Sequence, residues 1–216
     1  LPIYAELTTR EFIQMIFQAG LDIKKLPPEG FDTPLGSASG AGVIFGSTGG
    51  VMEATLRTVY ERLSSKPLER LELTAVRSEE YKEATIHAGE HELRVAVARG
   101  TGSARRLIDR MLEGEKEYHF VEVMACPGGC VGGGGQPIYI ETNDWNEQIS
   151  HRATRARGLH ELDRQRKHRK AHENPAVQKL YADFLGEPGS PRAHKLLHSR
   201  HQSRKLYADQ PLLVQR

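Results

Sequence analysis

Two cysteines set in a glycine-rich stretch constrain this chain more than any other feature. Cys126 and Cys130 are its only cysteines, and six of its 21 glycines lie between residues 121 and 137. The preceding residues, 118–124, are largely apolar and β-branched, which predicts a buried strand. The Pro-Gly-Gly at 127–129 cannot continue a strand or begin a regular helix, so the chain must turn there. Two thiols four residues apart across such a turn can converge on one ligand.

The spacing of the cysteines by itself leaves four interpretations open: a small disulfide, half of a zinc site, half of an iron–sulfur site, or no ligand. The run Gly132–Gly135 favours a ligand, because backbone without side chains can approach a bulky inorganic group closely. A cubane iron–sulfur cluster normally takes four cysteine thiolates, and this chain supplies two. Zinc could recruit histidine, but His119 is the one nearby and lies on the predicted strand, so zinc is the lesser alternative.

Composition bounds the class of protein. The 216 residues are 38% hydrophobic and 27% charged, which suits a soluble globular protein of one large or two small domains. No apolar run is long enough to cross a membrane. The chain begins with Leu1 and lacks a signal-peptide pattern, so we expect a processed product or a piece of a longer protein. Two cysteines do not make a disulfide framework.

Charge is unevenly distributed along the chain. Residues 1–150 hold 15 Lys and Arg against 22 Asp and Glu, a net charge of −7, whereas residues 151–216 hold 15 against 6, a net charge of +9. Such asymmetry can mark a tail that binds nucleic acid or a protein partner. In the basic run at 164–170 no aromatic residues are interleaved, which argues against nucleic acid and favours a solvated helix face.

Periodicity and turn signals predict an α/β fold, a parallel-rich sheet with flanking helices followed by a helical C-terminal tail. The first predicted helix begins at a capping signature over residues 8–11, a threonine N-cap with an acid following, and runs to about residue 19. The other predicted helices cover 51–63 and 104–113, and the predicted strands cover 42–46, 71–76, 84–87, 93–98 and 118–124. Strands 84–87 and 93–98 are expected to form a hairpin around Gly89-Glu90. The strand, helix and strand between residues 93 and 124 predict a βαβ unit with a right-handed crossover.

The tail carries two helix-start signals. Asn174-Pro175 is an N-cap followed by proline at the first helical position. That helix is expected to end at Gly186 and to bury four residues: Val177, Leu180, Tyr181 and Phe184. Ser190-Pro191 repeats the signal before a further helix.

Three segments resemble the iron-only ([FeFe]) hydrogenases. Residues 120–137, which include Val-Met-Ala-Cys-Pro-Gly-Gly-Cys and the glycine run, resemble the third cluster-binding signature of that family. Residues 42–58, Gly-Val-Ile-Phe-Gly-Ser-Thr-Gly-Gly-Val-Met-Glu-Ala-Thr-Leu-Arg-Thr, resemble a second motif. His-Glu-Asn-Pro at 172–175 and the residues up to 198 resemble the small-subunit-type C-terminal extension. The resemblance implies two parts, the C-terminal part of the large-subunit domain at 1–150 and a small-subunit-like tail at 151–216.

The resemblance also implies a cofactor, the H-cluster, in which a four-iron cubane is bridged through cysteine to a two-iron subsite with carbonyl and cyanide ligands. Cys126 would ligate the cubane, and Cys130 would ligate it and bridge to the subsite. The other implied residues are Met124 packing against the subsite, Phe45 and Gly46 lining its pocket, and Gln136 and Pro137 closing the loop.

The sequence also departs from the family pattern. Two earlier signatures supply the other two cubane cysteines, a proton-relaying cysteine and a lysine that holds a cyanide, and neither signature is present here. The N-terminal ferredoxin-like clusters are absent too. No catalytic residue is therefore expected within this chain, which holds half of the cubane ligands. It is expected to need the N-terminal part of the same protein and to be inactive alone.

The activity that the resemblance implies is reversible oxidation of H2 and reduction of protons. It implies an electron carrier such as ferredoxin or a nicotinamide-linked subunit, and no membrane. The expected compartment is the cytoplasm, with the periplasm as the alternative. A second hypothesis is a hydrogenase-like iron–sulfur assembly protein that shares the Met-Ala-Cys-x-x-Gly-Cys core, although Phe-Gly at 45–46 and the His-Glu-Asn-Pro tail favour the hydrogenases. A third is an interaction protein that acts through its basic tail.

Overall fold

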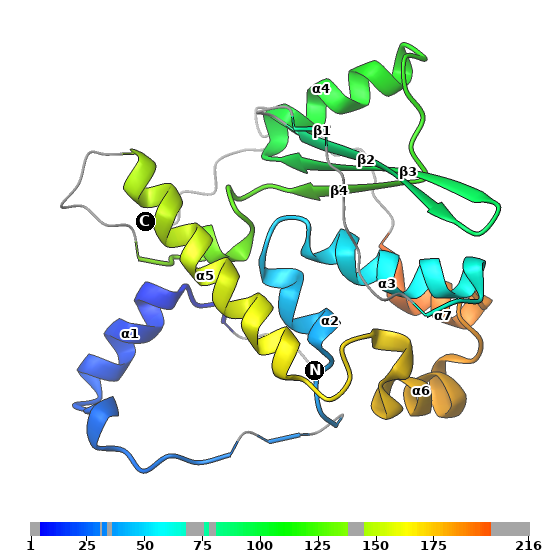
Figure 1. Cartoon of the computed structure of the whole chain (residues 1–216). Coiled ribbons are helices and arrows are strands. Elements are labelled where there is room, and N and C mark those ends of the chain that lie inside the picture. Colours follow the sequence, from blue (N-terminus) through cyan, green and yellow to red (C-terminus); the bar gives the residue numbers. More distant parts are fainter. Residues whose placement is uncertain are drawn as a thin grey trace, which may run out of the picture. The chain divides into compact units, whose positions relative to one another are not determined.

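The computed structural model describes residues 5–30, 32–33, 36–67, 76–77, 81–137 and 145–199 (Figure 1). The chain divides into two compact units, Leu1–Ala176 and Val177–Arg216. The first unit includes helix α5 (Trp145–Gln165), which packs against helix α2 (Gly40–Val43). Among the described residues no helix has both the length and the apolar character that crossing a bilayer requires.

A four-stranded sheet forms the centre of the first unit, in the order β1 (Val76–Arg77), β2 (Tyr81–Ala88), β3 (His91–Arg99) and β4 (Phe120–Met124). The predicted α/β class is confirmed, and so are the hairpin between β2 and β3 and the parallel pairing of β3 with β4. The sheet is not parallel-rich, however. Of the three pairings among the described strands, two are antiparallel, and a short turn at Gly89-Glu90 joins β2 directly to β3. The predicted strand at 71–76 lies outside the described residues except for its last residue, which is in β1.

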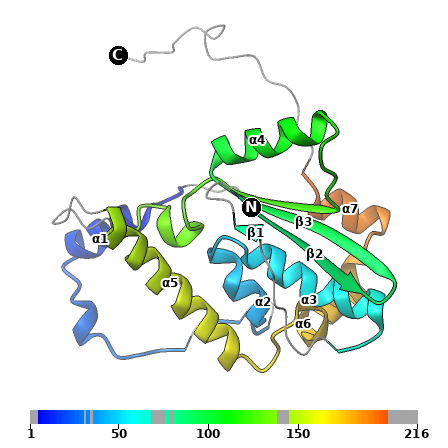
Figure 2. The same cartoon turned by 45° about the horizontal axis from the view of Figure 1, so that its top comes forward.

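Two apolar layers pack on opposite faces of β3. Alternate side chains of a strand point to opposite faces. Val95 and Val97 therefore pack with Met52 and Leu56 of α3 (Gly50–Ser64). On the other face Ala96 and Ala98 pack with Ala104 and Leu107 of α4 (Thr101–Leu112). Figures 1 and 2 both show α3 and α4 on opposite sides of the sheet. The core thus fixes β4, whose end leads to the cysteines, between these two helices.

Residues 40–46 are helical, so the strand predicted at 42–46 is wrong. Helix α2 is followed at once by the 3₁₀-helix η2 (Ile44–Gly46). The Ser39 hydroxyl caps α2. The first two backbone N–H groups of α2 donate to the carbonyl oxygens of His168 and Arg169, at 2.8 and 2.9 Å. The β-branched residues favour a strand locally, but these distant hydrogen bonds and the burial of Ala41 and Ile44 impose a helix.

The N-terminal helix α1 (Thr9–Gln18) has the predicted capping box. The Thr8 hydroxyl accepts the backbone N–H of Glu11, and the Glu11 carboxylate accepts the backbone N–H of Thr8 at 2.7 Å. The helix ends before Gly20, which adopts the left-handed backbone conformation (φ 68°). This end of the chain matters to the site because the first residue of α1 bonds to the cysteine loop.

The tail is helical as predicted, with α6 (Pro175–Leu180), a π-helical turn over Tyr181–Leu185 and α7 (Pro191–Leu197). The Asn174 and Ser190 caps are confirmed by their side-chain hydrogen bonds to Ala176 N and Ala193 N. The expected burial of Leu180 and Phe184 is wrong, since they are 38% and 48% exposed and Leu185 is buried instead. A π-helical turn is wider than an α-helical one, so the side chains after Leu180 leave the predicted register.

Candidate metal centre

The two cysteines lie on a tightly turned loop that leaves the end of β4, as the sequence predicted. Cys126 follows the strand, and Cys130 begins the 3₁₀-helix η3 (Cys130–Gly132). Each cysteine carbonyl accepts an N–H from three residues further on, Gly129 N at 3.0 Å and Gly133 N at 3.1 Å. Both thiols are free and exposed. The backbone is therefore fixed by its own turns while both cysteines remain exposed.

Two glycines show why the loop carries so few side chains. A Cβ built on Gly133 would lie 2.5 Å from Cys126 Sγ, so glycine leaves that side of the sulfur uncovered. A Cβ built on Gly129 would lie 2.7 Å from both Gly46 O and Thr48 N, and this residue also has a φ of 91°. Part of the glycine requirement thus comes from close packing of backbone against backbone, which the sequence had suggested only for an inorganic ligand.

The segment after η2 lies directly against this loop. Thr48 N donates to Gly128 O at 3.1 Å, and η2 contacts η3. The segments at 42–58 and 120–137, which are far apart in the sequence, are therefore adjacent in the fold. Gly46 lies at this contact, and Phe45 next to it is 47% exposed. A Cβ on Gly46 would also lie 2.7 Å from Leu159 Cδ1 of α5, so glycine is needed here for packing.

The remaining predicted site residues lie at the two ends of the loop. Met124 ends β4, is partly buried, and its carbonyl accepts Gly100 N at 2.7 Å. At the far end, the Gln136 side-chain amide donates to Thr9 Oγ1 at 3.1 Å. The Pro137 carbonyl accepts a hydrogen bond from Arg155 of α5 at 2.8 Å. The structure therefore gives Gln136 and Pro137 partners outside the loop.

Sequence reasoning missed Glu122, which joins β4 to α3. Its carboxylate is buried, with the residue 5% exposed, and it accepts the backbone N–H groups of Gly49 at 2.6 Å and Met52 at 2.7 Å. A carboxylate at the N-terminus of a helix is stabilised by the free N–H groups and by the helix dipole. The sequence offered one signal of this role, namely an acidic residue between two valines in an apolar strand. This contact fixes the segment at 46–49 relative to the strand that carries the cysteines.

Helix α5 is anchored beside the loop by a buried ion pair. Asp163, 1% exposed, accepts two hydrogen bonds from the Arg57 guanidinium, at 2.9 and 2.7 Å. Burial raises the pKa of Asp163, but hydrogen bonds and charges from Arg57 and Arg169 outweigh it and lower the pKa to about 2. A Cβ on Gly40 would lie 1.9 Å from Asp163 Oδ1, so α2 approaches α5 closely through that glycine.

The zinc alternative receives no support from the fold. Among the described residues, neither cysteine belongs to a group of three or more potential ligands with atoms within reach of one another. The His119 ring accepts Arg94 N at 3.0 Å and lies just before β4. Five strand residues at about 3.3 Å each separate it from the cysteine loop, on the order of 16 Å.

Two other groups of potential ligands are already neutralised by protein cations. They are Glu53, His160 and Asp163, and Glu61, His172 and Glu173. In the first, Arg57 donates to two of the carboxylates. In the second, the Lys170 ammonium bonds Glu61 at 2.6 Å and Glu173 at 3.0 Å. A metal ion would have to displace a paired cation at either place, so neither competes with the cysteines as a metal centre.

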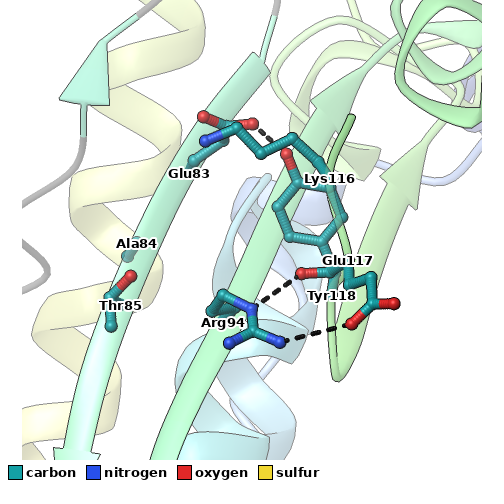
Figure 3. A pocket seen from close by; sticks show the side chains of 7 residues that line it. All are labelled: Glu83, Ala84, Thr85, Arg94, Lys116, Glu117 and Tyr118. Atoms are coloured by element: carbon teal, nitrogen blue, oxygen red, sulfur yellow. Dashed lines mark hydrogen bonds and ion pairs between the residues drawn. The ribbon is translucent and has the colours of Figure 1, made fainter. Parts of the chain in front are cut away.

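A pocket at the opposite end of β4 is separate from the cysteine loop (Figure 3). Several of its charged side chains already have partners in the protein. The Arg94 guanidinium donates to Glu117 O at 3.0 Å, and the Tyr118 hydroxyl donates to Glu83. Burial is the main cause that raises the pKa of Tyr118 above its ordinary value, and the contact with Glu83 is the second. Figure 3 shows these side chains turned toward one another across the pocket, which offers no cluster ligands.

The cysteine loop fits half of an iron–sulfur site. Cysteine thiolates are the usual ligands of such clusters, and a cubane takes four of them. The described loop presents two free thiols from a turned backbone, with Gly133 leaving space beside Cys126. The donor type therefore suits the group, and the number of donors requires ligands from elsewhere.

Comparison with known proteins identifies related sequences over most of the chain. The family model described as "Iron only hydrogenase large subunit, C-terminal domain" matches residues 3–134. The model described as "Iron hydrogenase small subunit" matches residues 149–204. The chain is 42% identical over 200 residues to the NADP-reducing hydrogenase subunit HndD of Solidesulfovibrio fructosivorans, covering 92% of this chain and 33% of that protein. It is 41% identical to iron hydrogenase 1 of Clostridium pasteurianum, covering 92% of this chain and 34% of the relative.

Solved structures agree with the sequence comparison. A structure of the [FeFe]-hydrogenase HydA1 from Chlamydomonas reinhardtii matches with a TM-score of 0.68 and 39% identity, over 88% of this chain and 53% of the other. A more distant relative, protein NAR1 of Arabidopsis thaliana, is 30% identical over 90% of this chain and 41% of its own length. The chain thus spans about a third of the length of the two curated hydrogenases that it matches.

Proposed function

The chain belongs to the iron-only hydrogenase family, and on that basis we propose that it forms part of an H-cluster site for the reversible oxidation of H2. The single observation that carries the proposal is the exposed pair of free thiols on a loop whose backbone packs against the segment at 46–48. When bound, the H-cluster would supply the iron chemistry that interconverts H2 with two protons and two electrons, which side chains alone do not perform.

The proposed roles of individual residues are those that the family resemblance implies. Cys126 and Cys130 would hold the cubane, and Cys130 would also bridge to the two-iron subsite. Met124 and Phe45, with Gly46, would form the wall around that subsite and limit the access of water. Gln136 and Pro137 would keep the loop closed through their bonds to Thr9 and Arg155. No catalytic proton donor within the chain is part of this proposal.

The partners follow from the incomplete ligand set. The other two cubane ligands would come from an N-terminal part of the same protein, since the relatives are about three times as long as the matched region. An electron carrier such as ferredoxin or a nicotinamide-linked subunit would exchange electrons with the site. We place the protein in the cytoplasm, with the periplasm as the alternative.

A hydrogenase-like iron–sulfur assembly protein is the second candidate. The match to protein NAR1 over 90% of the chain supports it. The higher identity to two hydrogenases favours the first candidate. The two functions differ in one observable, because only a hydrogenase requires the two-iron subsite with its carbonyl and cyanide ligands.

The experiment is infrared spectroscopy of the complete protein, produced anaerobically with H-cluster maturation and assayed for H2 uptake. Carbonyl and cyanide stretching bands together with H2 uptake are the expected result. A cubane signal without those bands would support the assembly protein. A protein that binds no iron would contradict both candidates. The gene upstream of Leu1 should also encode two further cysteine signatures.

A further inference from the structure

One face of α5 follows the cysteine loop and the segment beside it. Four residues spaced at three or four positions, and hence on one side of a helix, contact the body of the first unit. They are Arg152 beside Gly128 and Gly132, Arg155 on Val131 O and Pro137 O, Leu159 beside Gly46, and Asp163 on Arg57. One face of this helix is thus packed, whereas the basic run at 164–170, which begins at its C-terminal end, is mostly exposed.

Arg155 makes the most specific of these contacts. Its Nη1 donates to Val131 O at 2.9 Å and its Nη2 donates to Pro137 O at 2.8 Å. Val131 follows Cys130 directly, and Pro137 ends the loop. One planar guanidinium therefore sets the separation of two carbonyl oxygens at the two ends of the Gly-rich run.

We propose that Arg155 is a positioning residue for the cluster loop, holding Cys130 and the glycine run in the geometry that receives the cluster. This proposal rests on the proposed function. It assigns to α5 a role at the metal centre, although α5 lies beyond the large-subunit match that ends at residue 134 and mostly within the small-subunit match that begins at residue 149. The Asp163 anchor gives Arg155 a fixed base, because it joins the same helix to α3 through a buried ion pair.

Arg152 also lies against the loop, although glycine is needed at 132 first because a Cβ there would lie 2.2 Å from Pro127 O, and at 128 because φ is 85°. A Cβ on Gly132 would lie 3.1 Å from Arg152 Cδ, and a Cβ on Gly128 would lie 3.5 Å from Arg152 Cβ. The aliphatic part of the arginine therefore covers the loop backbone from one side. The loop is held between α5 on this side and the segment at 46–48 on the other, with Cys126 and Cys130 exposed.

The first test is backbone hydrogen exchange over residues 127–137 of the complete protein purified without iron. Arg155→Ala removes both hydrogen bonds, and we expect exchange in the loop to accelerate about tenfold. Arg155→Lys keeps the charge, but its ammonium group lacks the planar guanidinium geometry that reaches two carbonyl oxygens at once. We therefore expect exchange in the loop to accelerate in this variant too, while the protein remains folded. Arg157→Ala is the matched control on α5, since the exposed Arg157 guanidinium donates to Thr154 Oγ1 of the same helix at 3.0 Å, and we expect no change. Unchanged loop exchange in both Arg155 variants would overturn the proposal.

The second test is the midpoint potential and the electron paramagnetic resonance spectrum of the cluster in the matured complete protein. A positioning role predicts that both change in the Arg155 variants and stay constant in Arg157→Ala. A lower cluster content with an unchanged spectrum and potential would overturn the positioning role.

The two tests separate the proposal from the function on which it rests. If the wild-type protein binds no cluster while Arg155→Ala accelerates exchange in the loop, the contact of Arg155 with the loop is supported and the hydrogenase function is contradicted. If the wild type is an active hydrogenase and the variants alter neither loop exchange nor the spectrum, the function is supported and the positioning role of Arg155 is contradicted.

Discussion

At the scale of single residues, the site depends on glycines, because backbone segments without side chains can pack closely together. Gly49 has a φ of 91°, and a Cβ on Gly50 would lie 1.8 Å from Ile44 O. These two glycines let the chain reverse from η2 into α3. That reversal brings the N–H groups of Gly49 and Met52 to the Glu122 carboxylate. The segment beside the cysteines therefore requires glycine at both positions.

Gly50→Ala should destabilise the protein by about 2 kcal/mol, because the new methyl group forces the backbone of η2 to move. Gly102→Ala is the control. It lies in the first turn of α4 with nothing within 4 Å of the added Cβ, and it should gain up to about 1 kcal/mol. Urea unfolding followed by circular dichroism measures both. Equal stabilities for the two variants would contradict this account of the turn.

Glu122→Gln should cost about 1–3 kcal/mol, because an amide offers one acceptor where the carboxylate offers two and places an NH2 group against a backbone donor. Glu117→Gln, at an exposed position, should change stability by less than about 0.5 kcal/mol. Hydrogen exchange at residues 49–52 is the more specific measurement and should accelerate in Glu122→Gln alone. Protection equal to that of the wild type would show that the link between β4 and α3 is dispensable.

At the scale of elements, α5 and α3 depend on the ionised Asp163. Its folded pKa of about 2 lies below the ordinary 3.8. Its contribution to stability is therefore complete above the ordinary value and is lost as the pH falls toward 2. The difference in pKa corresponds to about 2 kcal/mol. When acid destabilises the protein, we expect this loss to be the share that comes from the contact between α3 and α5.

Asp163→Asn should lower stability by about 3 kcal/mol at neutral pH, since it removes the buried carboxylate that pairs with Arg57 and Arg169 and leaves Arg57 with Glu53 as its charged partner. Between pH 4 and pH 2 the variant should also lack the decrease in stability of about 2 kcal/mol that we expect in the wild type. Urea unfolding across this pH range makes the measurement, and Asp109→Asn, at an exposed acid of α4, should keep the wild-type pH dependence. An Asp163→Asn curve parallel to the wild type would refute the assignment.

The elements that could be predicted from sequence are those specified locally. The Thr8 and Ser190 caps, the hairpin at Gly89 and the turn at the cysteines each depend on residues close in the chain. Residues 42–46 could not be predicted, because backbone acceptors at 168–169 impose the helix there. The roles of Glu122 and Arg155 were also beyond reach, since each depends on partners brought close only by the fold.

At the scale of the whole molecule, the described first unit holds one side of a site. Two exposed cysteines lie on a loop held by α5, η2 and α1, and the family relatives are far longer than the matched region. The family could be predicted from sequence because long motifs carry it, and one of these motifs contains the two cysteines that we propose as cluster ligands. The ligands needed to complete the site lie outside what the described residues provide.

The 216-residue chain by itself should not keep a cubane cluster or oxidise H2, because two thiolates satisfy half of the cluster. Anaerobic reconstitution with iron and sulfide, followed by gel filtration and iron analysis, tests this. The complete protein treated in the same way is the comparison and should retain four irons or more per chain. A stable cubane in the isolated chain would mean that other groups complete the site.

The central claim is that Cys126 and Cys130 hold the cluster, and substitution of each by serine in the matured complete protein tests it most directly. The account predicts carbonyl and cyanide infrared bands in the wild type and in Glu117→Gln. It predicts their loss in Cys130→Ser, with a large reduction of cubane iron in Cys126→Ser. Full retention of the bands and of the cubane iron in both serine variants would contradict it.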